Sequence, residues 1–124
     1  MSLVLIVEDN EKNMKLARDV LQAKGYKTLE AVTGEEGVTL AKTHVPDLVL
    51  MDIQLPGING IEAFRQIRAE ASTAKVPVIA LTASVTPTDR SAISAAGFDA
   101  FVSKPINLKE FLETVKRLVD EAKK

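Results

Sequence analysis

Short apolar runs that end in a polar residue are the feature of this sequence that most limits its fold. Four runs stand out, at Leu3–Val7, Leu48–Met51, Val76–Leu81 and Ala100–Val102, and a weaker one covers Lys27–Ala31. Runs of this length suit buried strands, and the segments between them have the period of amphipathic helices. Strands that alternate with helices and are apolar on both faces predict a parallel sheet with helices on each side. The expected fold is therefore α/β, with a doubly wound, five-stranded parallel sheet.

The helical segments differ in how well they can bury one face. The last begins after Asn107, which can form a capping box with Glu110. A further helix is expected over about Ile61–Ala71, whereas Ser91–Ala96 offers little apolar surface beyond Ile93 and alanines. We therefore expect this fourth helix to be the least firmly packed. The last helix has the clearest apolar stripe, formed by Leu108, Phe111, Leu112, Val115, Leu118, Val119 and Ala122.

Length and charge limit the classes of function. The chain has 124 residues, 46% of them hydrophobic, which suits one domain with a single core. Sixteen basic residues oppose seventeen acidic ones, so neither nucleic acid nor an anionic membrane is favoured as a partner. Cysteine is absent, which fits a reducing cytoplasm, and no apolar run approaches the roughly 20 residues of a membrane span. We expect one cytoplasmic, monomeric domain over residues 1–124, without an output domain, that acts through contacts with other proteins.

The polar residues at the ends of the central runs carry the functional prediction. Glu8 and Asp9 follow the first run, and Asp52, Thr82 and Lys104 end or follow the later ones. The carboxyl ends of parallel strands lie on one edge of the sheet, and ligands bind there where the strand order reverses. Right-handed crossovers give the order 2-1-3-4-5, which places the first and third strands side by side. Asp9 and Asp52 are therefore predicted to be neighbours.

Three carboxylates at one edge need a counter-charge. Without one, at least one of Glu8, Asp9 and Asp52 should have a raised pKa, because like charges repel. Mg²⁺ prefers oxygen ligands and is usually held by one or two carboxylates together with phosphate oxygens. We predict that Asp9 and Asp52 bind Mg²⁺ directly and that Glu8 acts directly or through water.

Asp52 is also the candidate nucleophile. An aspartate carboxylate can attack phosphorus and form an acyl phosphate, and Asp52 ends a central strand before the exposed loop 53–57. The Lys104 ammonium can pair with one phosphoryl oxygen, while the Thr82 hydroxyl can donate a hydrogen bond to another. The pattern predicts phosphoryl transfer to Asp52, assisted by Thr82 and Lys104.

Jointly, these residues resemble the receiver domain of two-component response regulators, over essentially the whole chain. The resemblance implies a flavodoxin-like (βα)₅ receiver fold, in which Asp52 is phosphorylated by a histidine kinase or a histidine phosphotransfer protein. It implies a phosphoacceptor switch with slow autodephosphorylation, rather than an enzyme, that controls a downstream protein target. The matching pieces are Val7–Asn10, Asp47–Asp52, Gln54–Pro56, Gly60, Leu81–Ala83, Ala96–Asp99 and Lys104–Pro105.

The resemblance also assigns roles to single residues. Thr82 and Lys104 match residues that contact the phosphoryl group. Phe101 matches an aromatic side chain that changes rotamer, so the surface of the fourth helix, fifth strand and fifth helix should be the readout. Lys104–Pro105 matches a peptide bond that is usually cis. The implied Mg²⁺ ligands are Asp9, Asp52, the backbone carbonyl of Gln54 and, in an assisting role, Glu8.

The rim of the acceptor site gives two further expectations. The first helix, around Asn10, Asn13 and Met14, should face the phosphodonor, as should the loop before the last helix. The Met14 side chain itself is expected to pack in a stripe with Ala17 and Leu21. Gln54 and Ser84 each lie two positions after a residue of the predicted site. We expect both to tune hydrolysis of the acyl phosphate by shaping the access of water.

Within the family, the stretch Val7–Asn10 followed by Asn13 is most similar to the stand-alone, cell-cycle type of receiver, the DivK-like group, and to receivers fused to hybrid kinases. Glu8 stands where an aspartate is commoner, which lengthens one ligand arm. Phe101 stands where a tyrosine is frequent, which removes a hydroxyl group.

Simpler interpretations exist for each residue alone. Asp52 could be a turn residue and Lys104 an ordinary surface lysine. Phe101 could only fill the core, and His44, the sole histidine, is expected to be an ordinary residue at a helix C-terminus. Independent causes would not place acids, a hydroxyl and an amine together at parallel strand ends, so the joint pattern favours a site.

Three rival functions remain open at this point. A Mg²⁺-dependent phosphohydrolase with an Asp nucleophile generally needs a second acid two residues on, where this chain has Gln54. A flavin or nucleotide binder needs an uncharged, amide-rich loop after the first strand, where this chain has Glu8 and Asp9. A receiver acting only as a scaffold would bind its partner regardless of phosphorylation.

Overall fold

The computed structural model describes residues 2–55, 57–83, 87–104 and 106–122. They form one parallel sheet of five strands in the order β2-β1-β3-β4-β5, which confirms the predicted fold class and strand order. Two positions with predicted roles, Ser84 and Pro105, lie outside the described residues. The strands are β1 Leu3–Val7, β2 Lys27–Ala31, β3 Leu48–Asp52, β4 Val78–Thr82 and β5 Ala100–Ser103, and the helices are α1 Glu11–Ala23, α2 Gly34–His44, α3 Gly60–Ala69, α4 Pro87–Ala96 and α5 Leu108–Ala122.

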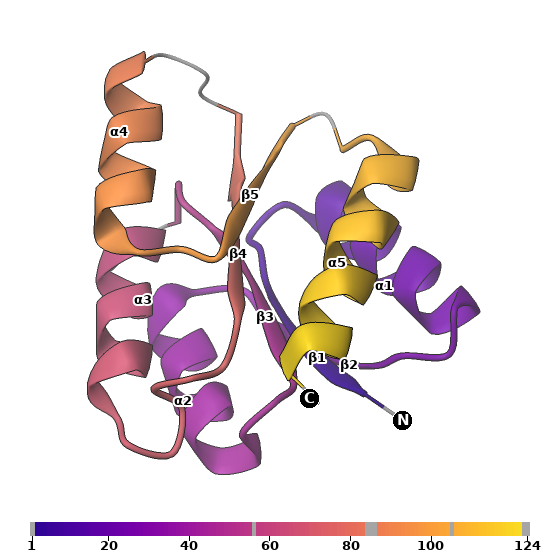
Figure 1. Ribbon diagram of the computed structural model, residues 1–124, viewed down its shortest axis with the longest axis horizontal. Helices are drawn as coiled ribbons and strands as arrows, with labels where there is room; N and C mark the ends of the chain where they lie inside the picture. Colours follow the sequence, from indigo (N-terminus) through magenta and orange to yellow (C-terminus); the bar gives the residue numbers. More distant parts are fainter. Residues whose placement is uncertain (1, 56, 84–86, 105, 123–124) are drawn as a thin grey trace.

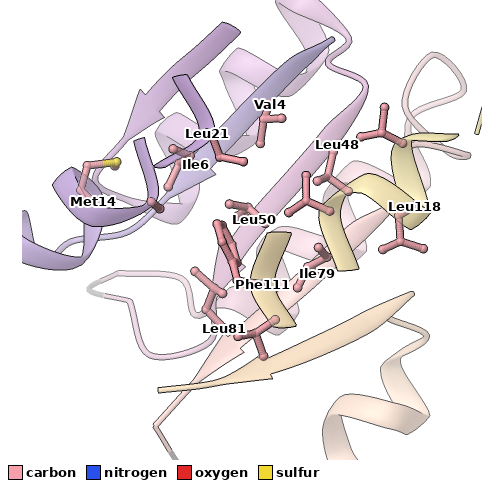
Figure 2. Close-up of a cluster of buried hydrophobic side chains, with 14 residues drawn as sticks. Val4, Ile6, Met14, Leu21, Leu48, Leu50, Ile79, Leu81, Phe111 and Leu118 are labelled. Atoms are coloured by element: carbon pink, nitrogen blue, oxygen red, sulfur yellow. The ribbon is translucent and has the colours of Figure 1, made fainter. Parts of the chain in front are cut away.

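The helices form two layers that cover opposite faces of the sheet. Figure 1 shows α1 and α5 on one face and α2, α3 and α4 on the other. Successive strand residues point to alternate faces, so Val4 and Ile6 pack beneath α1 and α5 while Leu5 and Val7 pack beneath α2 and α3. Figure 2 shows the first of these clusters, in which Phe111 of α5 lies against the central strands. Every residue of β3 is buried, as expected for a central parallel strand.

The strand register brings the carboxyl ends of the strands to one edge. Val7 at the end of β1 pairs with Met51, which precedes Asp52 on β3. Asp52 pairs with Leu81, and Thr82 at the end of β4 pairs with Ser103. The polar residues predicted to meet are therefore placed at the same level of the sheet.

The start of β4 differs from the expectation by two residues, because the strand begins at Val78 rather than at Val76. The Val76 backbone N–H is used in a turn, where it donates to the Thr73 carbonyl at 3.1 Å. Pro77 follows and has no N–H to offer a neighbouring strand. The strand therefore begins at Val78, whose N–H donates to the Asp99 carboxylate at 2.8 Å.

The predicted cap of the last helix forms, and glycines follow the ends of α1 and α4. The Asn107 side chain accepts from the Glu110 N–H at 3.1 Å, as a helix N-cap does. Gly25 and Gly97 have φ values of +91° and +100°, which glycine adopts without strain at helix ends. Among the described side chains of α4, at 91–96, only Ile93 is buried, which agrees with the weak packing expected of this helix. In the described part of the chain, no helix combines the length and apolar character that crossing a membrane requires.

Val45, which ends α2, provides a test of local backbone strain. It is a β-branched residue with φ 44° and ψ 70°, and its side chain is 45% exposed. The left-handed conformation costs an L-residue about 1–2 kcal/mol. Glycine avoids this cost, but it loses about 0.5–1 kcal/mol more conformational entropy on folding. Val45→Gly is therefore expected to raise the free energy of unfolding by roughly 0.5–1 kcal/mol, measured by urea denaturation. Val32→Gly is the matched control, because Val32 is also exposed but has no positive φ; a gain in both variants, or in neither, contradicts the assignment of strain to Val45.

Candidate functional site

Three carboxyl groups meet at the carboxyl edge of the sheet. Oxygen atoms of Glu8, Asp9 and Asp52 all lie within 4.8 Å of one another. Glu8 and Asp9 follow β1, and Asp52 ends the adjacent strand β3, so the strand order explains their proximity. Glu8 and Asp52 are buried, whereas Asp9 is exposed. The cluster therefore has a buried interior and one ligand arm in solvent.

Lys104, which follows β5, supplies the positive charge of this cluster. Its Nζ lies 2.7 Å from Glu8 Oε1 and 3.2 Å from Asp52 Oδ2, and its side chain is only 15% exposed. Its backbone N–H donates to the Thr82 carbonyl at 2.8 Å, which places the lysine beside the end of β4. The sequence predicted Lys104 for this edge, and the structure adds that the ammonium group bridges two carboxylates.

The remaining carboxylate oxygens are held mainly by the backbone. Asp52 Oδ1 accepts a hydrogen bond from the Gln54 N–H at 3.1 Å, and Glu8 Oε2 accepts from the Asn10 N–H at 3.3 Å. Glu8 Oε1 is buried, and its contact within the described residues is the Lys104 ammonium group at 2.7 Å. The charge of this buried oxygen is therefore compensated inside the cluster by Lys104.

Burial and mutual repulsion separate the pKa values of the two buried acids. Burial, followed by the hydrogen bond and the charge of Glu8, raises the pKa of Asp52 to about 7. Burial also acts to raise the pKa of Glu8, but hydrogen bonds with Asp52 and Lys104 outweigh it and lower that pKa. Burial would lower the pKa of Lys104, yet its two acidic partners raise it. Glu8 and Lys104 therefore form a charged pair, and Asp52 is the acid with the raised pKa, as expected for one of three neighbouring carboxyl groups.

The donor set fits a hard divalent cation. Its members are carboxyl oxygens from the ends of neighbouring strands, and the single ammonium group of Lys104 cannot balance all three acids once Asp52 loses its proton. Such an oxygen-rich set is typical of Mg²⁺, which also keeps several waters. The exposed arm, Asp9, leaves one side of the cluster open to water or to a ligand.

Thr82 and Phe101 lie on the two strands beyond Asp52. Thr82 ends β4 and is buried, directly beside the end of β3. Phe101 lies one strand further out, opposite Ala80, with 40% of its surface exposed. An aromatic side chain that is exposed this far on a strand is not simply part of the core, which removes the core-filling interpretation.

Two glycines fix the loop that follows Asp52. A Cβ atom on Gly60 would lie 2.2 Å from the Asp52 carbonyl oxygen, and the Gly60 N–H donates to the Ile53 carbonyl at 3.0 Å. From the other side, a Cβ atom on Gly34 would lie 2.7 Å from the Ile58 side chain and 2.9 Å from its carbonyl oxygen. The starts of α3 and α2 therefore clamp the loop that carries Gln54. The sequence analysis missed Gly34, whose only signal was a glycine directly after the N-cap Thr33.

Met14 of the first helix packs as expected. It is only 6% exposed and lies with Ala17 and Leu21 in the core, so Asn10 and Asn13 are the residues of this region that stay available to a phosphodonor. Asn10 caps α1 through the Asn13 N–H and stays at the rim of the site. Leu16, two residues after Met14, is 37% exposed and lies on the outer side of the helix.

Comparisons with known proteins give a consistent picture. Residues 4–116 match the model of the response regulator receiver domain. The chain is 44% identical over 119 residues to the polar-differentiation response regulator DivK of Brucella ovis, covering 96% of this chain and 97% of that protein. The same identity and coverage hold for the DivK protein of Brucella abortus.

Solved structures agree in fold. The receiver domain of a sensor histidine kinase from Pseudomonas aeruginosa, whose structure has magnesium coordinated in its active-site cleft, is 33% identical with a TM-score of 0.90, covering 96% of this chain and 98% of that one. A response regulator structure from Chloroflexus aurantiacus is 28% identical with a TM-score of 0.91, covering 96% and 98% of the two chains.

The raised pKa of Asp52 predicts a pH dependence of stability in the metal-free protein. An acid with a higher pKa in the folded than in the unfolded state binds an extra proton when folded, so stability falls as pH rises between the two values. The fall is expected between about pH 4 and about pH 7. Within this range, the free energy of unfolding should decrease by at most about 1.4 kcal/mol per pH unit. Urea unfolding with a chelator should show this fall in the wild type and not in Asp52→Asn. Parallel curves for the two proteins would contradict the assignment.

The close approach of Gly60 to Asp52 predicts a steric penalty. Gly60→Ala is expected to destabilise the protein by about 1–3 kcal/mol, because the Cβ meets backbone that cannot rotate away. It should also weaken the stabilisation that Mg²⁺ confers in thermal unfolding, because Asp52 moves. Gly25→Ala is the control: its Cβ meets nothing within 4 Å, so it should show only the left-handed backbone penalty. If Mg²⁺ stabilised both variants equally against thermal unfolding, Gly60 would not be needed to position Asp52.

Proposed function

The chain belongs to the response regulator receiver domain family, whose members are phosphoacceptor switches rather than classical enzymes, and we propose that it accepts a phosphoryl group on Asp52 from a phosphohistidine. The observation that carries this proposal is the placement of the Asp52 carboxyl between a second buried acid and the Lys104 ammonium group. This acid is at the end of a central strand, so its position is fixed while its carboxylate faces the open edge of the sheet.

Mg²⁺ is the proposed cofactor of the reaction. Receiver domains bind this ion at their acidic pocket, and the proposed ligands here are Asp9, Asp52 and the backbone carbonyl of Gln54, with Glu8 assisting directly or through water. The Gln54 N–H already contacts Asp52, and the loop that carries Gln54 is clamped by Gly34 and Gly60. When bound, the ion would neutralise the carboxylates and the oxygens of the incoming phosphoryl group.

The transfer step follows from the charges around Asp52. The carboxyl group must lose its proton before a carboxylate oxygen can attack phosphorus, forming an O–P bond as the N–P bond of the phosphohistidine breaks and the histidine nitrogen keeps the electron pair. Lys104 lies 3.2 Å from Asp52 Oδ2 and can pair with a phosphoryl oxygen at the same place. Thr82 ends the adjacent strand and supplies a hydroxyl donor.

The proposed switch links this charge change to the outer strand. When the Thr82 hydroxyl turns towards the phosphoryl group, it leaves space that Phe101 fills from its exposed position on β5. The surface of α4, β5 and α5 then changes, and a downstream protein target reads that change. The thin packing of α4 favours this route, because a weakly packed element needs little free energy to shift.

The proposed partners are a histidine kinase or a histidine phosphotransfer protein on the donor side. The rim that would receive the donor consists of Asn10, Asn13 and the loop before α5, with the exposed Leu16 in place of the buried Met14. We also propose slow autodephosphorylation of the acyl phosphate, because water reaches the exposed side of the cluster at Asp9. The residue two positions after Asp52 is Gln54, an amide, so the second acid that a phosphohydrolase uses is absent there.

Intact-mass analysis after incubation with acetyl phosphate tests the proposal. The wild type is expected to gain one phosphoryl group with Mg²⁺ and none with a chelator, because the anionic donor must approach an anionic site. Asp52→Asn should gain none under either condition. Lys104→Ala should be phosphorylated more slowly, with an added cost in stability because two carboxylates lose their buried counter-charge.

Asp47→Asn is the matched acid control, since Asp47 precedes β3 at the other end of that strand and its carboxylate accepts from the Leu3 N–H at 2.7 Å. It should be phosphorylated like the wild type. A phosphoryl group that persists in Asp52→Asn, or modification independent of Mg²⁺, would refute the assignment of Asp52. Multiple turnover of a small phosphoester would instead favour a phosphohydrolase.

A further inference from the structure

A second hollow lies away from the acid cluster, between α5 and the turn that joins α1 to β2. This α5 groove is lined by Lys24, Tyr26, Lys109, Leu112, Glu113 and Lys116 and has a volume of about 410 Å³. It is larger than the hollow of about 310 Å³ that lies beside Glu8 and Asp9. None of its lining residues belongs to the acid cluster, and Phe101 is not among them. The proposed phosphorylation site therefore does not account for it.

The floor of the α5 groove is apolar and rigidly placed. Tyr26 and Leu112 are partly buried and pack against the hydrophobic cluster beneath α1 and α5. The Tyr26 N–H donates to the Leu21 carbonyl at 3.1 Å, and the Lys24 N–H donates to the same carbonyl at 3.0 Å. These bonds close the end of α1 through Gly25, which is in the left-handed conformation. The backbone of Tyr26 is thus fixed by the turn, and its side chain packs against the hydrophobic cluster.

The rim of the α5 groove is mainly positive. Lys109, Leu112, Glu113 and Lys116 recur at spacings of three and four on α5, so they form one stripe along the helix. With Lys24 they give three ammonium groups against one carboxylate, in a chain whose net charge is −1. None of the three lysines forms an ion pair with a described residue.

From this arrangement we propose that the α5 groove docks an acidic amphipathic segment of a partner protein, with an apolar side chain on Tyr26 and Leu112 and carboxylates against the lysines. A helix whose anchors recur at three and four residues matches an apolar floor of this kind. Burial, followed by the charge of the nearby Asp120, raises the pKa of Tyr26, so its hydroxyl is protonated near neutral pH and can donate to a carboxylate. The groove lies where α5 meets the turn between α1 and β2, and it includes no residue of α4 or β5, so we expect docking to be independent of phosphorylation of Asp52.

The chain carries its own reporter for this groove, because Tyr26 is its only tyrosine and tryptophan is absent. The probe is a synthetic helical peptide of about 15 residues, near the length at which isolated helices become marginal. It contains leucines at spacings of three and four, glutamates on both sides and no tyrosine or tryptophan. Its titration is expected to change the Tyr26 fluorescence saturably, whereas a peptide with lysines in place of the glutamates should leave it unchanged.

Charge-reversal variants make the test specific to the α5 groove. Lys109→Glu combined with Lys116→Glu should weaken binding of the acidic peptide at least about tenfold, and added salt should weaken wild-type binding. The control combines Lys12→Glu with Lys75→Glu, which changes the net charge equally at exposed lysines outside the groove and should bind like the wild type. Asp52→Asn should also bind like the wild type, so the docking proposal and the phosphorylation proposal can fail separately.

Several outcomes overturn the proposal. Equal binding of the acidic and basic peptides would show that charge does not select the occupant. Equal weakening in both double variants would show that only net charge matters. A change in Tyr26 fluorescence that follows protein concentration alone, together with a dimer in sedimentation, would assign the groove to a second copy of this chain.

Discussion

The structure depends on burying two carboxyl groups beside one ammonium group at the carboxyl edge of the sheet. Taking charges out of water costs several kcal/mol for each ion, and Lys104 offsets this cost for Glu8 and Asp52 together. The balance is incomplete, because the pKa of Asp52 rises to about 7 and a third acid, Asp9, lies within ligand distance. A site that is short of positive charge favours the binding of a cation, which would also lower the repulsion towards an anionic phosphoryl donor. The deficit of positive charge that lowers stability is therefore also what would favour cation binding in the proposed switch.

The opposite edge of the sheet carries the structural hydrogen bonds. There Arg68 of α3 donates to the Val76 carbonyl and to Asp99, and Asp99 also accepts from the Val78 N–H. The Arg68 guanidinium lies over the Phe64 ring, which stacks on Phe98 with the ring centres 4.1 Å apart. These contacts tie α3 to the starts of β4 and β5. The two outer strands are therefore anchored at the ends far from the acid cluster. A change at the acid cluster is then expected to move side chains on the outer strands and not the sheet itself.

Much of the architecture could be read from the sequence because the signals are local. The apolar runs, the Asn107 cap and the glycines at helix ends each depend on neighbouring residues, and the structure agrees with them. One strand boundary was wrong. The apolar run begins at Val76, but the Val76 N–H is used in a turn and Pro77 has no N–H, so β4 begins at Val78; an apolar run alone does not show where the hydrogen bonds of a sheet start.

The sequence by itself determined the α/β class, the order of the strands and the kinds of polar group at their ends, because hydrophobic period and chain connectivity leave few topologies. Only the tertiary structure decided that Lys104 bridges Glu8 and Asp52, that Asp52 is the acid whose pKa is raised, and that Gly34 and Gly60 confine the loop beside it. A pKa and a steric clash depend on burial and on separations of a few ångströms. Burial and these separations are set only when the strands pair in register.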